Sequence, residues 1–567
     1  MRRRGVLPGR RALAAVTAEA FGNGAAVLGL ETIDAATFAH LHAGDTPDGS
    51  RRLIQTQNGV HITGIDVSLS APKSASVALL GASEAQRQVL HEAWHEAARA
   101  GAEVLQRRAR VVRVPVRSPT QAGTRVYKSG PNKGQPCKTQ GSDVEWQTAG
   151  LVGLLVDHST ARPSEANIER GDPPDLHLHS HLWLANMALC ADGRIRGIND
   201  RGIKRELRTV EAAVQAEFAR LIEDRLGWKI DYHTDQRGDT RWEIAGVDPR
   251  LRQAHSTRSA EVAGLARGFE QRHGRPPLPS ELRDLARIHR RAKDPHHDHD
   301  HAPRLDDYLA AAQRDHLPLP KFERAGRRAS LSEREAELTR RLMAPSGLCR
   351  QDALFYRESI EPAVLRCAAG LGLSPAQLVD YTERLLQSPE LTVERKVGDD
   401  PSRFDLFSTR AVKSREALIA DTLVAKATAA APAPEPVAVG RAMHRAAHPL
   451  DGEQRAAVAA ACSPRAFTVI EGWAGTGKST TLHTVVDAYL GRGTGTAAVA
   501  DHVYALACAG LAAQGTAERI GADAGHTVES FCAAVEHGRL RPTERTVLVV
   551  DEYITVDTFR MARLLAA

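Results

Sequence analysis

The stretch DLHLHSHLWLAN, residues 175–186, carries a histidine at every second position of an otherwise apolar run. Successive side chains of a β-strand point to opposite faces, so residues two apart share a face. The run therefore predicts a strand with the imidazoles of His177, His179 and His181 on one face. The intervening residues would occupy the other face: Leu178, Ser180 and Leu182.

One metal ion cannot be held by all three imidazoles. Residues two apart in a strand are separated by ~6.6 Å, which two side chains can close around one ion, whereas residues four apart are separated by ~13 Å, which bonds of ~2.1 Å cannot span. A third ligand must come from another segment, and His158, which ends the apolar run GLVGLLVDH, is the best donor. We predict a divalent ion, with Mg, Mn and Zn left open, held by His158, His179 and His181. The alternative is a row of ordinary histidines on a solvated sheet.

The region around this strand alternates strand-like runs with one strong helix. Ser83 is expected to cap that helix, which runs to Arg108, and Gln86 is its capping-box partner. Further strands are predicted at residues 64–70, 109–116, 124–128, 150–158 and 241–247.

Composition predicts five segments along the chain. The first domain covers residues 1–285, and a polar, Pro-interrupted linker covers 286–330. A charged helical accessory segment follows over 331–426. Residues 427–440 form a Pro/Ala stretch that we expect to be an extended spacer. Residues 441–567 alternate short apolar runs with helical patterns, as parallel α/β domains do.

The segment EGWAGTGKST, residues 471–480, has the spacing of a phosphate-binding loop. It follows a predicted strand, AFTVI (466–470), and precedes a helical run. Backbone amides of such a loop cradle phosphates, Lys478 would reach the β and γ oxygens, and Ser479 would bind Mg²⁺. The predicted loop residues are Gly472, Trp473, Ala474, Gly475, Thr476, Gly477, Lys478, Ser479 and Thr480.

A Walker B pattern lies downstream, where the apolar strand TVLVV is followed by Asp551 and Glu552. Asp551 is expected to support Mg²⁺, and Glu552 is expected to position the attacking water. Both motifs in the correct order favour an ATP site with bound Mg²⁺.

Overall composition bounds the class of protein. The 567 residues have 42% hydrophobic residues and a formal net charge of +6, which fits a multidomain protein that can bind nucleic acid. The seven cysteines are scattered without a CxxC pair, which favours a reducing compartment. No run approaches the ~20 apolar residues of a membrane span. We expect a cytoplasmic protein without membrane insertion.

The segment GIDVSLSAPKSASVALL, residues 64–80, together with the histidine strand, resembles the conjugative relaxases of the MobF class, the TraI and TrwC type. Residues 178–181 fall on the LHTH tetrapeptide of that family, and His158 falls on its separate histidine. Residues 18–47 and 242–262 resemble further parts of the family pattern. The resemblance covers about residues 20–265 and selects the same three histidines as the strand spacing.

The resemblance implies an HUH-type domain, an α+β fold with an antiparallel sheet, that nicks one strand of plasmid DNA at a transfer origin. In such enzymes a tyrosine attacks the scissile phosphate, and a histidine-bound metal polarises it. Asp66 matches a family aspartate that would orient a ligand histidine or help to deprotonate the tyrosine. Lys73 has two interpretations, a contact to DNA phosphate and a solvated lysine at a helix start, and we expect the second. The implied partners are single-stranded or hairpin origin DNA, a coupling protein and secretion machinery.

The C-terminal segment adds a second resemblance. LDGEQRAAV, residues 450–458, is similar to the adenine-contacting motif of superfamily 1 helicases, which places Gln454 beside the base. The stretch GTAAVADHVYALACAGLAAQG is similar to RecD-type helicases. The predicted fold class is therefore α/β and multidomain: a relaxase domain, a helical segment and a partial P-loop RecA-like domain.

Three hypotheses for function remain open. The first is a relaxase–helicase fragment that nicks plasmid DNA in conjugative transfer. The second is an origin-DNA-binding protein without strand cleavage, because the sequence has no tyrosine before Tyr127. The third is an ATP-dependent DNA motor in which the histidine strand is structural. Because the sequence stops shortly after Glu552, we expect ATP to bind without driving unwinding.

Overall fold

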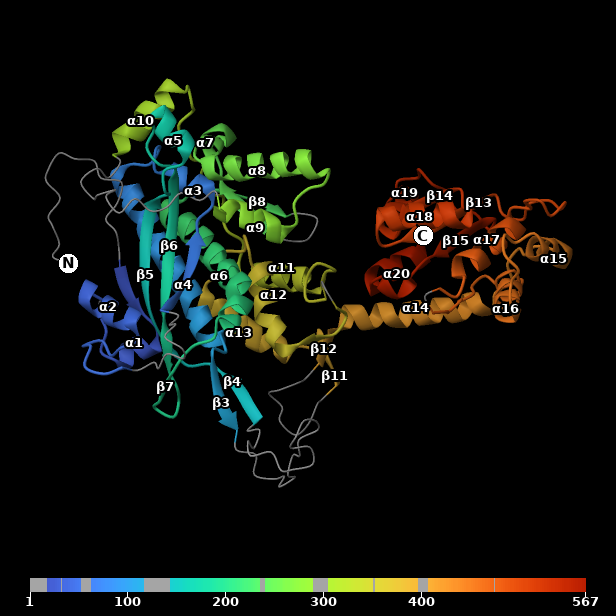
Figure 1. Cartoon of the computed structure of the whole chain (residues 1–567), viewed down its shortest axis with the longest axis horizontal. Coiled ribbons are helices and arrows are strands. Elements are labelled where there is room, and N and C mark those ends of the chain that lie inside the picture. Colours follow the sequence, from blue (N-terminus) through green and yellow to red (C-terminus); the bar gives the residue numbers. More distant parts are fainter. Residues whose placement is uncertain are drawn as a thin grey trace, which may run out of the picture. The chain divides into compact units, whose positions relative to one another are not determined.

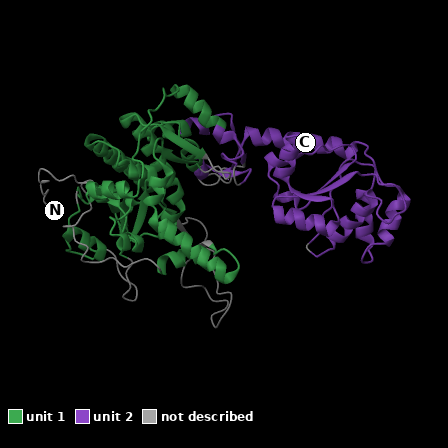
Figure 2. Cartoon of the chain, turned by 90° about the horizontal axis from the view of Figure 1, so that it is seen from above, with its two compact units in different colours: residues 1–340, 361–382 green, residues 341–360, 383–567 purple. Residues whose placement is uncertain are grey.

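A computed structural model describes residues 18–31, 33–52, 63–116, 143–234, 240–288, 304–349, 352–395, 406–473 and 475–567. The predicted strand at 124–128 lies outside these ranges. The chain divides into two compact units, which Figure 2 shows in two colours. Unit 1 contains residues 1–340 and 361–382, and unit 2 contains residues 341–360 and 383–567.

Unit 1 is built around an antiparallel sheet with the strand order β1-β5-β6-β2, and β7 pairs with the end of β6 (Figure 1). Its strands are β1 (Ala18–Phe21), β2 (Gly64–Ser70), β5 (Gly150–Thr160), β6 (Leu176–Leu189) and β7 (Ile195–Arg196). β2 has the predicted bounds, and β5 and β6 extend beyond theirs. The antiparallel α+β architecture is confirmed for this unit.

Helices α4 (Glu84–Arg108) and α6 (Asp200–Leu226) cover one face of this sheet. The predicted capping box of Ser83 and Gln86 opens α4. Trp94 of α4 is fully buried, and its indole N–H donates to the hydroxyl of Ser180 on β6 at 2.8 Å. A Cβ added at Gly101 would come within 2.2 Å of a Val214 methyl group, so only glycine allows α4 and α6 to approach this closely.

The opposite face carries the histidines, and two short helices pack at one end of it. α1 (Asn23–Val27) and α2 (Ala35–Ala43) share a buried cluster with β5 and β6. The Phe38 ring of α2 packs on Trp183 of β6 with 4.6 Å between ring centroids. These contacts confine the histidines to the remaining part of the face.

Further elements complete unit 1. Two hairpins pair antiparallel, β3 (Val112–Val116) with β4 (Asp143–Gln147) and β8 (Ile230–Thr234) with β9 (Thr240–Ile244). The remaining helices before residue 300 are α3 (Lys73–Ala78), α5 (Glu165–Arg170), α7 (Pro249–Ala254), α8 (Thr257–His273) and α9 (Pro279–Ile288).

The prediction of a polar linker over 286–330 is wrong for the described residues from 304 onward. Helix α10 (Leu305–Arg314) is part of unit 1 and buries Leu305, Tyr308 and Ala312, each at most 3% exposed. The Tyr308 hydroxyl donates to the Pro174 carbonyl at 2.7 Å. These apolar residues are spaced i, i+3 and i+7 on one helix face, a pattern that the surrounding charged residues conceal.

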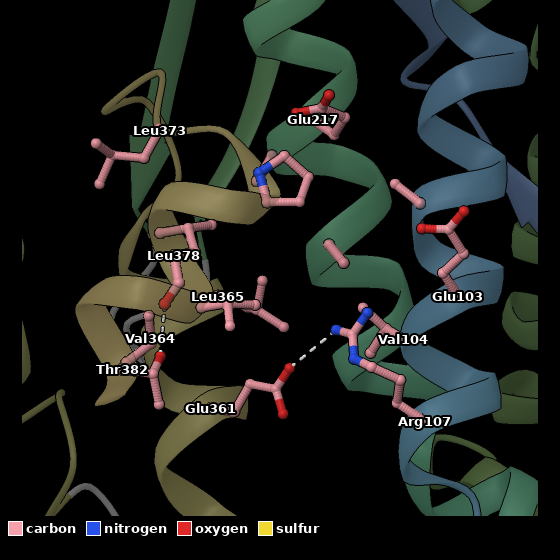
Figure 3. Close-up of a pocket in the computed structure, with 15 residues that line it drawn as sticks. Glu103, Val104, Arg107, Glu217, Glu361, Val364, Leu365, Leu373, Leu378 and Thr382 are labelled. Atoms are coloured by element: carbon pink, nitrogen blue, oxygen red, sulfur yellow. Dashed lines mark hydrogen bonds and ion pairs between the residues drawn. The ribbon is translucent and has the colours of Figure 1, made fainter. Parts of the chain in front are cut away.

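The predicted helical segment 331–426 divides between the two units. It contains α11 (Leu331–Met343), α12 (Ile360–Cys367), α13 (Pro375–Leu386) and α14 (Arg410–Thr428). In unit 1, parts of α12 and α13 border a narrow cleft against α4 and α6 (Figure 3). Glu361 closes one side of this cleft because it accepts from Arg107 at 3.3 Å and from Arg108 at 2.7 Å.

Unit 2 contains two three-stranded sheets. The first has the order β10-β12-β11, and these strands, which the sequence did not predict, are β10 (Phe355–Tyr356), β11 (Leu391–Arg395) and β12 (Leu406–Thr409). The second is parallel with the order β14-β13-β15, formed by β13 (His502–Ala507), β14 (Ala524–Thr527) and β15 (Thr546–Val550).

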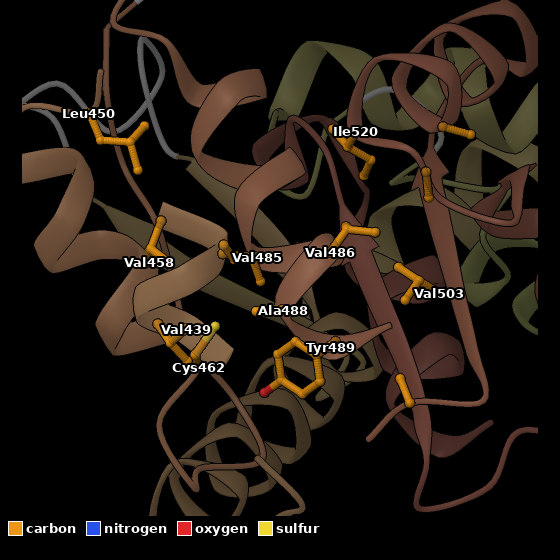
Figure 4. Packing of buried hydrophobic residues seen from close by; sticks show 14 residues of the cluster. Val439, Leu450, Val458, Cys462, Val485, Val486, Ala488, Tyr489, Val503 and Ile520 are labelled. Carbon is orange, nitrogen blue, oxygen red and sulfur yellow. The ribbon is translucent and has the colours of Figure 1, made fainter. Parts of the chain in front are cut away.

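Helices surround the parallel sheet and share a buried cluster with it (Figure 4). The helices of this cluster are α15 (Pro436–His444), α16 (Gly452–Ala461), α17 (Lys478–Tyr489) and α18 (Gly510–Ile520), whereas α19 (Val528–Glu536) and α20 (Thr558–Ala566) contribute to a second buried cluster. The predicted α/β character of residues 441–567 is confirmed.

Two local predictions for unit 2 are wrong. The expected spacer 427–440 contains the start of α15, where Ala438 is buried and Val439 belongs to the buried cluster of Figure 4. Pro436 lies in the first turn of the helix, where its missing N–H costs no hydrogen bond. The expected strand 466–470 joins no strand ladder of the described residues, because β13 pairs with β14 on one side and β15 on the other.

Candidate functional site

The strand register of unit 1 brings the three predicted metal ligands together. In the β5–β6 ladder, His158 is directly opposite His179, and Val156 is opposite His181. The ring centroid of His158 is 5.2 Å from that of His179 and 5.5 Å from that of His181. His179 and His181 are also 5.2 Å apart. The cross-strand donor inferred from the sequence therefore lies beside the two strand neighbours.

Hydrogen bonds at Nδ1 orient two of these rings. His179 Nδ1 lies 2.8 Å from the His177 carbonyl oxygen, which can only accept, so this nitrogen carries the proton and Nε2 remains for a metal. His181 Nδ1 lies 2.9 Å from each carboxylate oxygen of Asp66 on β2. A carboxylate or carbonyl partner of this kind fixes the orientation of a metal-binding histidine. Asp66 thus lies where it can orient His181.

The three rings of the predicted triad differ in the angles between their planes. His158 and His179 are stacked with 26° between their planes, whereas His181 stands edge-on to both. Within the described ranges, no group of three or more His, Cys, Asp or Glu side chains converges as a metal site. The metal triad therefore stays a prediction.

Burial favours the neutral form of His177 and His179. Burial lowers the pKa of His179 to about 4 and the pKa of His177 to about 3. The neutral imidazole is the form that binds a metal ion. Among the predicted ligands, His179 is therefore in the protonation state that a divalent transition ion requires.

His177 has an environment that differs from those of the predicted ligands. Its ring stacks on His179 with centroids 4.6 Å apart, and its Nε2 lies 3.4 Å from the Ser70 hydroxyl. Its Nδ1 is buried and has no hydrogen-bond partner in the described part of the chain. His177 therefore packs behind His179, which is consistent with its omission from the predicted triad.

Lys73 differs from the expected solvated lysine. Its ammonium donates to the Leu176 carbonyl at 2.9 Å, and burial lowers its pKa against the opposing effects of Asp175 and Glu243. No local pattern around Lys73 indicates this burial, because Lys73 and Leu176 are 103 positions apart in the sequence.

The face of the sheet that the helices cover carries a polar network that was not predicted from the sequence. Asp157 is 9% exposed, and its carboxylate lies 2.6 Å from His95 Nδ1 and accepts from the Ser180 hydroxyl. His95 Nε2 lies 2.8 Å from Glu19 on β1. The hydrogen bond to Asp157 raises the pKa of His95 although burial opposes it. Helix α4 is thereby tied to β1 and β5, next to His158.

In unit 2, the phosphate loop leads directly into α17, which begins at Lys478. Gly475 and Gly477 have φ values of 82° and 74°, which favour glycine at both positions. The Lys478 ammonium donates to the carbonyls of Gly472 at 2.6 Å and Trp473 at 3.2 Å. The lysine therefore folds back onto its own loop. Ser479 and Thr480 lie in the first turn of α17, and Ala474 lies outside the described residues.

The structure brings the other predicted ATP-binding residues to the same unit. The Gln454 amide of α16 donates to the Thr476 carbonyl at 3.1 Å, so this glutamine contacts the loop. Asp551 directly follows β15, and Glu552 has a left-handed backbone with φ 49°. The Tyr553 hydroxyl donates to Glu471 at 3.0 Å, which ties the segment after Asp551 to the start of the loop.

Residues 13–127 and 135–310 match the model of the TrwC relaxase family. The chain belongs to the TrwC relaxase family. Residues 449–567 match the AAA domain, so the TrwC-type relaxase region is followed by an AAA domain. Both halves of the sequence-based assignment, and the order of the two regions, are confirmed.

Solved structures of conjugative relaxase TrwC in complex with OriT DNA are similar to this TrwC-family chain. The metal-free complex has 23% identity and a TM-score of 0.40, and covers 53% of this chain and 92% of that chain. The metal-bound complex has 23% identity and a TM-score of 0.39, and covers 53% and 90%. No curated protein matches the chain. In the described part of this TrwC-family chain, no helix is long and apolar enough to cross a membrane.

Proposed function

We propose that this TrwC-family chain is a conjugative relaxase with a helicase-type AAA domain, and that it acts on one strand of plasmid DNA at a transfer origin with the help of a divalent ion. The observation that carries this proposal is the cluster of His158, His179 and His181, in which Asp66 and a backbone carbonyl preset two of the rings. Binding of DNA and the family's tyrosyl transesterification are carried over from the family membership.

In the proposed reaction, the three histidines would hold the divalent ion, and Asp66 would orient one of them. A bound divalent ion supplies polarisation of the scissile phosphate. Asp66 keeps the proton of His181 on Nδ1, which would leave Nε2 to hold the ion. In the family chemistry, a tyrosine oxygen forms a bond to phosphorus, the 3′ oxygen leaves, and the 5′ end remains on the tyrosine. Neutral imidazoles suit this task because they leave the charge of the ion uncancelled.

For the AAA domain we propose ATP binding with Mg²⁺. Lys478 would exchange its bonds to Gly472 and Trp473 for phosphate oxygens. Ser479 and Asp551 would meet Mg²⁺, Glu552 would position water, and Gln454 would lie beside the base. The packing of Gln454 against Thr476 supports this assignment.

A second candidate function is binding of origin DNA without cleavage. It is favoured by one observation: within the described ranges, the side chains of the histidine face do not converge as a metal site. Incubation of the 567-residue chain with hairpin and single-stranded oligonucleotide libraries, followed by boiling in detergent, separates the two functions. A covalent protein–DNA product supports the enzyme. Salt-sensitive binding without such a product supports the binding protein.

The proposed metal site is tested by calorimetric titration of Mn²⁺ and Zn²⁺ into the metal-stripped chain. His179→Ala and His181→Ala should each lower metal affinity ~10-fold or more, a loss as large as removal of an orienting partner causes. His177→Ala is the matched control from the same strand face and should change the affinity little. Equal losses for His177→Ala and His179→Ala would disprove this ligand set. An unaltered affinity in all three variants would favour the motor hypothesis with structural histidines.

A further inference from the structure

The Walker B carboxylate of Asp551 is held by a helix that carries none of the predicted ATP-site motifs. Asp551 follows β15, and its backbone N–H donates to the Leu506 carbonyl of β13 at 2.9 Å. Its Oδ2 atom accepts from the hydroxyl of Thr516 at 2.7 Å. Thr516 lies on α18 and is 2% exposed. Both the backbone and one carboxylate oxygen of Asp551 are therefore fixed.

Arg519 determines the direction of the Thr516 hydroxyl. Its guanidinium donates to Thr516 Oγ1 at 2.8 Å. A guanidinium has only donors, so the threonine oxygen must accept this bond and can give its single proton only to Asp551. Arg519 also lies 3.8 Å from Asp551 Oδ2, which adds an ionic attraction to the same oxygen. The three side chains form a directed relay, from arginine through threonine to aspartate.

Both contacts that Thr516 and Arg519 make with the Asp551 carboxylate are to its Oδ2 atom. Oδ1 is thereby left as the atom that can face a Mg²⁺ ion or one of its waters. Mg²⁺ requires nearly ideal octahedral geometry, so a carboxylate with a fixed orientation binds it or its waters better than one that rotates freely. The donor atoms of the site therefore fit the ion that a phosphate loop would bring.

We infer that Thr516 and Arg519 are positioning residues for the Mg²⁺-binding carboxylate of the ATP site. This inference rests on the proposed nucleotide-binding function and extends it to two residues outside the phosphate loop and Walker B strand. Thr516 acts through Asp551, and Arg519 acts through Thr516. Loss of either should weaken Mg²⁺-dependent nucleotide binding and leave Mg²⁺-free binding unchanged.

The test measures binding of adenylyl imidodiphosphate, a non-hydrolysable ATP analogue, to the full chain by calorimetry in Mg²⁺ and in EDTA. The ratio of the two affinities should fall ~10-fold in Thr516→Val, by the scale of lost orienting contacts, and should recover in Thr516→Ser, which keeps the hydroxyl. Arg519→Ala should lower the ratio by a smaller factor. Thr494→Val is the matched control, because Thr494 is 1% exposed and its hydroxyl meets only Thr496 among described residues.

The outcomes are distinguishable. Unchanged ratios in both Thr516→Val and Arg519→Ala, or equal losses in Mg²⁺ and EDTA, would overturn the inference while the ATP site stands. Arg519 is exposed enough, at 57% of its side chain, that Arg519→Ala tests the relay even if Thr516→Val fails to fold. If the unaltered chain binds no analogue, or binds it as well after Lys478→Ala, the proposed ATP site fails and the inference with it.

Discussion

The histidine face of unit 1 and the phosphate loop of unit 2 are both predicted to take part in binding a divalent ion, but they prepare for it differently. The histidines lie on paired strands, and two of them already donate to fixed acceptors. In the loop, Lys478 donates to the carbonyls of its own loop, bonds that a phosphate must replace. The histidine site has two rings already oriented, whereas the loop needs an exchange of hydrogen bonds before it can bind phosphate. The paired strands of unit 1 thus orient their side chains before an ion binds, whereas the loop of unit 2 must change its hydrogen bonds when phosphate binds.

Lys478→Ala should have the largest effect of the changes that test this comparison. The lysine makes two charge-assisted bonds within the loop, and comparable bonds to phosphate contribute about 1.5–3 kcal/mol each, so nucleotide binding should be abolished. Calorimetric titration with ATP in the presence of Mg²⁺ measures the nucleotide affinity. Lys204→Ala, at an exposed lysine of unit 1, serves as the control. Binding that persists within a few-fold would show that the loop does not hold the phosphates.

Asp66→Ala should have an intermediate effect, on the histidine site alone. Removal of the acceptor lets the His181 ring turn, and metal affinity should fall ~10-fold. A double-mutant cycle makes the test specific: once His181→Ala is present, Asp66→Ala should have no further effect if it acts through that ring. Asp192→Ala, at an exposed carboxylate of the same unit, is the control. Additive losses would mean that Asp66 acts independently of His181.

The smallest effect concerns the pH dependence of the stability of unit 1. The folded-state pKa of His95 is raised, chiefly by its hydrogen bond to Asp157. Its contribution to the free energy of unfolding is therefore complete below the unfolded pKa of about 6.5 and is lost as pH rises through the folded value. The stability difference between the unaltered chain and His95→Gln should shrink over that rise.

Urea unfolding followed by tryptophan fluorescence measures this difference, because Trp473 alone of the six tryptophans lies in unit 2. His483→Gln, at a half-exposed histidine of unit 2, is the matched control. A difference that grows with pH would contradict a charged His95 between Asp157 and Glu19.

Local patterns predicted much of what the structure contains. The bounds of β2, the capping box of α4 and the alternation of β6 are encoded within a few residues each, so spacing was sufficient. His158 was found because an apolar run ending in histidine suggested a neighbouring strand. The family resemblance supplied Asp66, and the structure gives it a partner in His181.

Other features could not be read locally because they depend on residues distant in sequence. The contact of His95 with Asp157 and the contact of Thr516 with Asp551 join residues 62 and 35 positions apart. Burial of Val439 depends on α17, which packs against α15. The run 466–470 has strand-like composition, but composition does not supply a neighbouring strand.

The pairing of His158 with His179 has a consequence for folding fidelity. Because side chains alternate with a period of two, a shift of β5 by one residue against β6 would exchange the environments of Asp157 and His158. The carboxylate would enter the histidine face, and the imidazole would lie beneath α4. Metal affinity would therefore act as a check on assembly, since only chains with the correct strand alignment would present all three imidazoles together.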